Sequence, residues 1–181
     1  MRTSLLAVSL ACGLAAAPAH AGEVIGGLYA HAVETPFTFD TGEGGVDAQI
    51  GIRSDPIEGL AFVGKPQAHL FGSVNSKEGG TDFVAAGLSW RLGLGGGPLY
   101  LRPGIGLALH NAPSLRVDPD TRIRTDLGSR VLFEPEIAIG AQLSRDLSLE
   151  ASWVHISNAQ IFDSEQNPGI DMMGLRLGMR F

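Results

Sequence analysis

Cysteine is almost missing from this 181-residue sequence, and long apolar runs are missing too. The single cysteine, Cys12, lies in the leader described below, so we expect a mature chain without disulfides or cysteine catalysis. No later stretch offers the about 18 consecutive apolar residues that a membrane-spanning helix needs. Charged residues make up only 18% of the chain, and the net charge of −6 argues against a nucleic-acid partner.

The first 21 residues have the pattern of a secretory signal peptide. Met1-Arg2 supplies the positive end, an apolar run covers Leu5–Ala17, and Ala19-His20-Ala21 forms a small-residue cleavage site. We therefore predict a signal peptide over residues 1–21. The remaining residues, 22–181, have the length of one exported domain.

Apolar and polar residues alternate along most of this domain, and glycine is in excess, with 25 in the whole sequence. Eight segments show the period of two that marks a β-strand with two different faces: 24–32, 45–53, a part of 60–75, 81–92, 99–110, 129–143, 147–157 and 171–181. The third segment is expected to bend near Lys65-Pro66. The connections alternate between two sets. Those at 54–59, 93–98 and 144–146 are short and are expected on the periplasmic side. Those at 33–44, 76–80, 111–128 and 158–170 are expected on the outer side and are mostly long. This pattern predicts an eight-stranded antiparallel transmembrane β-barrel of the bacterial outer membrane.

In such a barrel the apolar row of each strand faces lipid and the other row fills the lumen. The other row is rich in glycine, poor in lysine, and carries charges that we expect to pair with one another: Arg102, Arg176, Arg180, Glu134, Glu136 and Glu150. The alternative is a soluble, lipocalin-like periplasmic barrel whose apolar row points inward. Glycine suits a crowded lumen better than a solvated surface, which favours the membrane barrel.

Three polar residues interrupt the apolar rows of the last two strands, all at the end next to the loop that joins them. They are His155 and Ser157 on one strand and Asp171 on the other. A serine needs a base to become a nucleophile, and the base needs an acid to orient it, so these residue types point to ester or amide hydrolysis. The alternative interpretation is that they are polar side chains at the level of the lipid headgroups.

The residues around these positions resemble a known family. The run His155-Ile156-Ser157-Asn158-Ala159, followed by Asn167-Pro168-Gly169-Ile170-Asp171, is similar to the C-terminal signature of the PagL-type lipid A 3-O-deacylases, which are eight-stranded outer-membrane barrels. The resemblance implies that His155 is the base, Ser157 the nucleophile and Asp171 the acid. The best-known members have glutamate at the acid position, and Glu165 and Asp163 in the same loop are alternative acids.

The resemblance also implies a reaction and a partner. The reaction is hydrolysis of the acyl ester at the 3-position of lipid A, which releases a 3-hydroxy fatty acid and requires no metal or cofactor. Candidate oxyanion donors are Asn158 and Asn167. The partner is lipopolysaccharide in the outer leaflet, and a homodimer is allowed although nothing in the chain indicates one.

A basic loop either contacts the phosphates of lipid A or is simply solvated; its arginines are Arg116, Arg122, Arg124 and Arg130. The alternative function for the whole chain is a non-enzymatic outer-membrane barrel, either structural or adhesive or a carrier of hydrophobic molecules.

Overall fold

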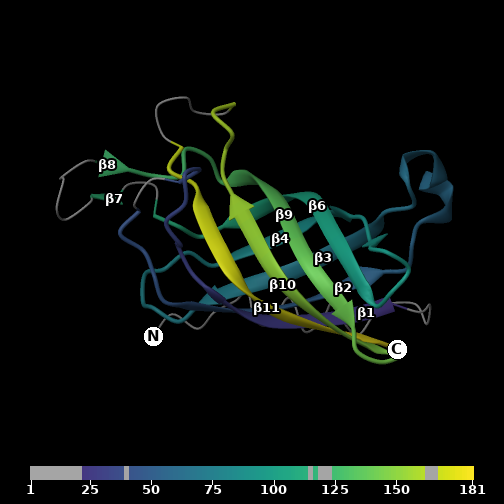
Figure 1. Cartoon of the computed structure of the whole chain (residues 1–181). Coiled ribbons are helices and arrows are strands. Elements are labelled where there is room, and N and C mark those ends of the chain that lie inside the picture. Colours follow the sequence, from purple (N-terminus) through teal and green to yellow (C-terminus); the bar gives the residue numbers. More distant parts are fainter. Residues whose placement is uncertain (1–21, 39–40, 114–115, 118–123, 162–166) are drawn as a thin grey trace.

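The computed structural model describes residues 22–38, 41–113, 116–117, 124–161 and 167–181. The predicted signal peptide lies outside these residues. The elements are β1 (Gly22–Ala30), β2 (Val46–Ser54), the 3-10 helix η1 (Glu58–Val63), β3 (Gln67–Asn75), β4 (Phe83–Ser89), β5 (Leu92–Gly93), β6 (Leu99–His110), β7 (Arg116–Val117), β8 (Arg124–Thr125), β9 (Val131–Gln142), β10 (Leu147–Ile156) and β11 (Ile170–Arg180) (Figure 1). No helix among the described residues is long and apolar enough to cross a membrane.

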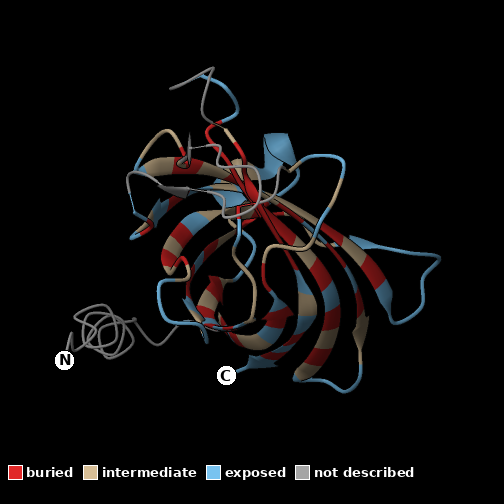
Figure 2. Cartoon of the chain, turned by 90° about the vertical axis from the view of Figure 1, so that its left-hand side faces the viewer, coloured by how far each residue is buried: buried red, intermediate tan, exposed pale blue. Residues whose placement is uncertain are grey.

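The main sheet closes on itself. Its strands follow the order β4-β3-β2-β1-β11-β10-β9-β6-β5, every pair is antiparallel, and β4 also pairs with β6. The short strand β5 continues the line of β4 along β6, so that β4 and β5 together count as one strand. The described strands therefore form one eight-stranded barrel. The view along the barrel shows this closed ring (Figure 2). The predicted eight-stranded antiparallel barrel is confirmed.

The two faces of the wall point as the alternation predicted. Large apolar side chains such as Leu28, Ile50 and Leu175 are 64%, 48% and 59% exposed, whereas their polar neighbours along each strand are buried. Buried and exposed positions therefore alternate in bands along the strands (Figure 2). An apolar outer face suits lipid and not water. The alternative of a soluble barrel with an inward apolar row is wrong.

The lumen holds a paired network of charges centred on Glu150. Its carboxylate accepts hydrogen bonds from Arg53 Nη2 at 3.1 Å, Arg102 Nε at 2.8 Å and Arg176 Nε at 2.8 Å. Arg176 also reaches Glu136, with 2.9 Å between Nη1 and Oε2. These residues are buried, so each charge depends on its partners for the interactions that water would otherwise provide.

The prediction that the lumen charges pair holds for this network. Glu134 pairs with His69, with 3.1 Å between the carboxylate and Nε2. The prediction was wrong for Arg180, which does not lie among the buried lumen charges. It is exposed, because it is the last residue of β11 and lies at the rim of the barrel.

Replacing Glu150 with alanine is expected to lower the free energy of unfolding by about 3–5 kcal/mol, because three buried guanidinium groups lose their shared counter-charge. Urea unfolding in lipid vesicles, followed by tryptophan fluorescence, measures this. Glu58→Ala is the matched control, because Glu58 pairs with Lys65 at 2.7 Å on an exposed turn. Such a surface pair contributes about 1 kcal/mol or less. Equal effects of the two substitutions would contradict a structural role for the lumen network.

The structure departs from the predicted third strand. Residues 58–63 form η1 instead of a strand, so the connection after β2 extends to Pro66 and not to Gly59. Pro66 cannot donate a backbone N–H, and pairing therefore begins beyond it, with β4 at Gln67 and with β2 at His69. The connection is fastened to the wall by Trp90, whose Nε1 donates to the carbonyl of Val63 at 2.7 Å.

The predicted fourth strand, 81–92, is likewise shorter than expected and interrupted. Its pairing with β6 stops at Ser89 and resumes at Leu92. One of the two β6 residues opposite the gap is Pro103, which accepts a hydrogen bond from Trp90 N at 2.9 Å but cannot donate one in return. The ladder is broken by the proline on the neighbouring strand and not by the sequence of the fourth strand itself.

The connections gather at the two ends of the barrel. At one end lie η1 and the turns that precede β6 and β10; at the other lie the connections that follow β1, β3, β6 and β10, including β7 and β8 (Figure 1). We call the four latter connections the outer loops, numbered in chain order. The end of β10 and the start of β11, where the candidate catalytic residues lie, belong to this second end.

Candidate active site

His155 and Asp171 form a directly opposed pair on β10 and β11. Nδ1 of the imidazole lies 2.7 Å from Oδ1 of the carboxylate. Directly opposed residues of an antiparallel pair have Cβ atoms about 5 Å apart, a distance that an aspartate can bridge without the extra methylene of glutamate. The structure therefore brings Asp171 to the imidazole, while the catalytic roles of the two residues stay a prediction.

Ser157 follows the last residue of β10 and is held against β9 instead of β11. Its N–H donates to the carbonyl of Phe133 at 3.1 Å, and its own carbonyl accepts from Phe133 N at 2.7 Å. This bridge keeps the serine extended, two residues beyond His155 and on the same face of the wall. Because Nδ1 of the imidazole is engaged by Asp171, Nε2 is the nitrogen available to the serine hydroxyl.

Asp171 is completely buried, and its carboxylate accepts three hydrogen bonds. Besides His155, Trp153 Nε1 donates to Oδ1 at 2.8 Å, and the hydroxyl of Thr35 donates to Oδ2. Donors from β10 and from the first outer loop satisfy the buried charge and leave the carboxylate little freedom to rotate.

The first outer loop covers this pair from outside. Val33 N donates to the backbone carbonyl of Asp171 at 2.9 Å, and the ring of Phe37 lies 6.1 Å from that of Trp153. His155 and Ser157 are only 8% and 7% exposed, although both lie on the face of the wall that is otherwise lipid-facing.

Sequence analysis missed both Trp153 and Thr35 as parts of the site. Trp153 belongs to the apolar row of its strand, and its place two residues before His155 on the same face is a usable signal, because an indole N–H requires a partner when buried. Thr35 gave no signal. It lies 136 residues from Asp171 in an irregular loop, and only the pairing of β1 with β11 brings the two together.

Asn158 and Asn167 fasten the fourth outer loop. The backbone N–H of Asn158 donates to Asn167 Oδ1 at 2.9 Å, and the side-chain amide of Asn158 donates to the carbonyl of Leu127 at 3.2 Å. The side-chain oxygen of Asn158 accepts from Gln160 N at 2.6 Å. These contacts give both asparagines a structural role beside Ser157, while their role as oxyanion donors stays a prediction.

The arginines of the third outer loop are only partly described. Arg116 and Arg124 belong to the two-stranded ladder β7–β8, and Arg122 lies outside the described residues. Arg130 is exposed, and its guanidinium donates to the carbonyl of Ala112. Contact with phosphates stays a prediction. The alternative acids Asp163 and Glu165 also lie outside the described residues.

Comparison with known proteins adds a family and a fold. The sequence model of the lipid A 3-O-deacylase (PagL) family matches residues 37–180, while comparison with curated proteins gave no match. Among solved structures, the outer membrane enzyme PagL is similar with a TM-score of 0.62 and 19% identity, covering 87% of this chain and 98% of that one.

Two further solved structures share the fold. The N-terminal β-barrel domain of Pseudomonas aeruginosa OprF is similar with a TM-score of 0.56 and 14% identity over 90% of this chain and 98% of that one. Neisserial surface protein A gives 0.53 and 10% over 89% and 97%. At these identities the structural likeness shows the fold alone.

Proposed function

Because this chain belongs to the lipid A 3-O-deacylase (PagL) family, we propose that it is an outer-membrane serine esterase that removes the 3-O-linked acyl chain of lipid A. The observation that carries the proposal is the 2.7 Å contact between His155 and Asp171, on the lipid-facing side of the wall and two residues from Ser157. A histidine paired with a carboxylate, and a serine two residues along on the same face, are the residue types that a serine esterase uses.

The reaction proceeds through an acyl-enzyme. Nε2 of His155 accepts the hydroxyl proton of Ser157 while Oγ attacks the ester carbonyl carbon. The tetrahedral intermediate collapses by breaking the bond to the 3-oxygen of the sugar, which takes the proton from His155. Water then attacks the acyl-enzyme with His155 again as base, so that a 3-hydroxy fatty acid leaves and the serine is restored.

Asp171 acts in this scheme through His155. Its carboxylate fixes the imidazole with the Nδ1 proton directed at Oδ1, which leaves Nε2 unprotonated and directed away from the carboxylate. The same negative charge stabilises the imidazolium that forms when Ser157 loses its proton. Burial of Asp171 strengthens this interaction because water does not screen it.

The surroundings of the site support a lipid substrate. Next to it along the same face lie Ala151 on β10 and Met173 and Leu175 on β11, all exposed and apolar. An acyl chain packed along this surface stays in the hydrocarbon region while its ester bond reaches the rim of the barrel. A site facing the lumen would instead meet the buried charges around Glu150.

Mass spectrometry of lipid A tests the function directly. The chain is expressed in a host whose lipid A carries a 3-O-linked hydroxyacyl chain, and folding in the outer membrane is verified by heat-modifiable gel migration. We expect lipid A to lose the mass of one hydroxyacyl chain. Unchanged lipid A in the presence of the folded protein would contradict the enzyme and favour the non-enzymatic barrel.

Thr35 is expected to be a positioning residue for this reaction. Replacing it with valine removes the hydrogen bond to Asp171 Oδ2 without changing the volume of the side chain. We expect kcat to fall about 10-fold with little change in KM, since about one hydrogen bond to a charged group is lost from the support of the imidazole. Steady-state kinetics on lipopolysaccharide in detergent micelles measure both constants.

Serine at position 35 is the matched variant, because it keeps the hydroxyl and loses only a methyl group. We expect Thr35→Ser to retain most of the kcat. If serine and valine lowered kcat equally, the hydrogen bond to Asp171 would have no part in catalysis.

A further inference from the structure

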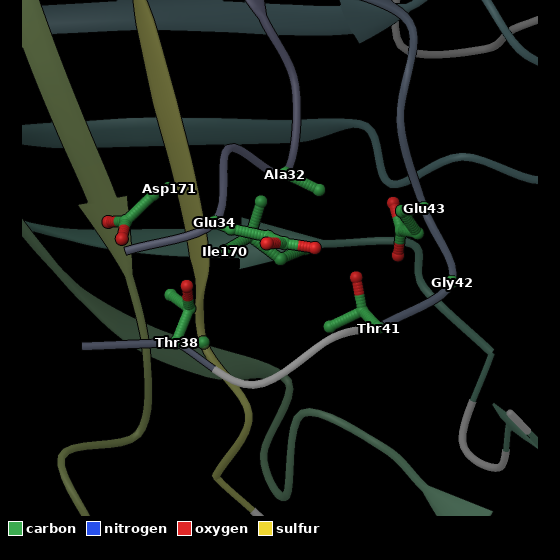
Figure 3. A pocket seen from close by; sticks show the side chains of 9 residues that line it. Ala32, Glu34, Thr38, Thr41, Gly42, Glu43, Ile170 and Asp171 are labelled. Atoms are coloured by element: carbon green, nitrogen blue, oxygen red, sulfur yellow. The ribbon is translucent and has the colours of Figure 1, made fainter. Parts of the chain in front are cut away.

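A cavity of about 300 Å³ lies beside Asp171, between the first outer loop and the start of β11 (Figure 3). Its lining includes Glu34, Thr38 and Thr41 from the loop and Gly169 and Asp171 from the strand side. The volume is at the lower end of the range of about 300–1,000 Å³ that is usual for small-molecule sites. The reaction steps given above leave this space unused.

The side chain of Thr41 indicates that the cavity receives a polar ligand. Thr41 is only 8% exposed, and its hydroxyl has no hydrogen-bond partner among the described residues. Figure 3 shows this hydroxyl pointing into the space between the side chains of Glu34 and Glu43. A buried hydroxyl without a partner is unfavourable, and a ligand that supplies a polar atom removes that penalty.

The charges of the lining select the kind of ligand. Glu34 is exposed at the cavity, and Glu43 directs its carboxylate to His31 Nε2 at 2.7 Å and to the hydroxyl of Thr81 at 2.7 Å. Ionised carboxylates only accept hydrogen bonds, so a ligand must bring O–H or N–H donors. Phosphate is disfavoured, because three carboxylates, including that of Asp171, line the same space.

The cavity, which Asp171 lines, also lies next to His155, because Gly169 of the lining is beside the imidazole. Gly169 has a φ of +65°, and a Cβ atom there would lie 2.9 Å from His155 Cε1 and 3.3 Å from Thr38 Cγ2. The glycine therefore fills the gap between the imidazole and the loop that lines the cavity. A molecule whose ester lies at His155 and Ser157 can extend past this glycine into the cavity.

We propose that the cavity is a subsite for the amino-sugar ring that carries the scissile ester. The hydroxyl and amide N–H groups of the ring donate hydrogen bonds to the carboxylate of Glu34 and the hydroxyl oxygen of Thr41. The hydroxyl of Thr41 in turn donates to an oxygen of the ring's substituents. This inference rests on the proposed function, because it takes lipid A as the substrate. It assigns the sugar to the first outer loop and the acyl chain to the barrel wall, and it leaves the phosphates outside the cavity.

Two substitutions in the cavity, Thr41→Val and Glu34→Ala, test the subsite, with Glu78→Ala as the matched control. Glu78 is exposed in the second outer loop and does not line the cavity. We expect KM for lipopolysaccharide in mixed micelles to rise about 3- to 10-fold for each cavity variant, as the loss of one hydrogen bond predicts. Glu78→Ala is expected to keep the wild-type KM.

A long-chain alkyl fluorophosphonate separates this inference from the function on which it rests. The reagent reacts with an activated serine and carries a chain but no sugar. We expect wild type and both cavity variants to be labelled at equal rates. Absence of labelling and of deacylation in wild type would overturn the proposed function. Normal KM for lipopolysaccharide in both cavity variants, or equal losses of labelling and hydrolysis, would overturn the sugar subsite alone.

Discussion

Replacing Ser157 with alanine is expected to reduce the deacylation of lipid A by about 10⁴- to 10⁶-fold. The substitution removes the only atom of the proposed site that bonds to the acyl group, and His155 then has no hydroxyl to activate. The backbone of residue 157 remains paired with Phe133, so the barrel and the loop should be unchanged. Release of the 3-hydroxy fatty acid, measured by mass spectrometry with purified protein in micelles, gives the rate.

Ser152→Ala is the matched control for this prediction. Ser152 lies on the same strand with its buried side chain on the lumen face, so its loss tests whether any serine of β10 affects the rate. We expect it to keep wild-type activity and fluorophosphonate labelling, while Ser157→Ala loses both. A Ser157→Ala protein that still releases the fatty acid at a substantial fraction of the wild-type rate would exclude the serine mechanism.

Replacing Asp171 with asparagine is expected to reduce the rate by about 10³- to 10⁴-fold. The amide is nearly the same size, but it lacks the charge that stabilises the imidazolium. It also brings its own N–H group among the donors Trp153, His155 and Thr35, which all require an acceptor. The histidine then loses its fixed orientation, and the Nδ1 proton is no longer held in place.

Glu165→Gln is the comparison that identifies the acid. Glu165 lies in the connection between β10 and β11, whereas Asp171 lies on β11 directly opposite His155. We expect Glu165→Gln to retain most of the activity. Heat-modifiable migration of both variants ensures that a low rate is not due to an unfolded barrel. A larger loss in Glu165→Gln than in Asp171→Asn would assign the acid to the loop.

The arrangement of strands could be predicted from the sequence because a lipid-facing wall imposes a period of two on every strand. The same rule placed His155, Ser157 and Asp171 on one face. The register, which makes His155 and Asp171 direct partners, depends on how β10 and β11 align, and alternation alone leaves that alignment open.

The parts that escaped prediction depend on contacts between distant segments. The break in the fourth strand is caused by Pro103 on another strand, and the turn before β3 depends on the contact of Trp90 with Val63. Thr35 belongs to a loop without periodicity, so nothing in its sequence indicated that it would reach Asp171. Irregular segments are positioned by tertiary contacts and not by local pattern.

The contacts of Thr35 and Val33 with Asp171 lie across the line where the first and last strands of the chain meet. A chain in which β1 has not yet paired with β11 can contain the histidine and serine but has neither of these two contacts to the acid. On the proposed function, we therefore expect full activity only when β1 and β11 are paired. The strand pairing that closes the barrel is thus also the pairing that completes the support of the acid.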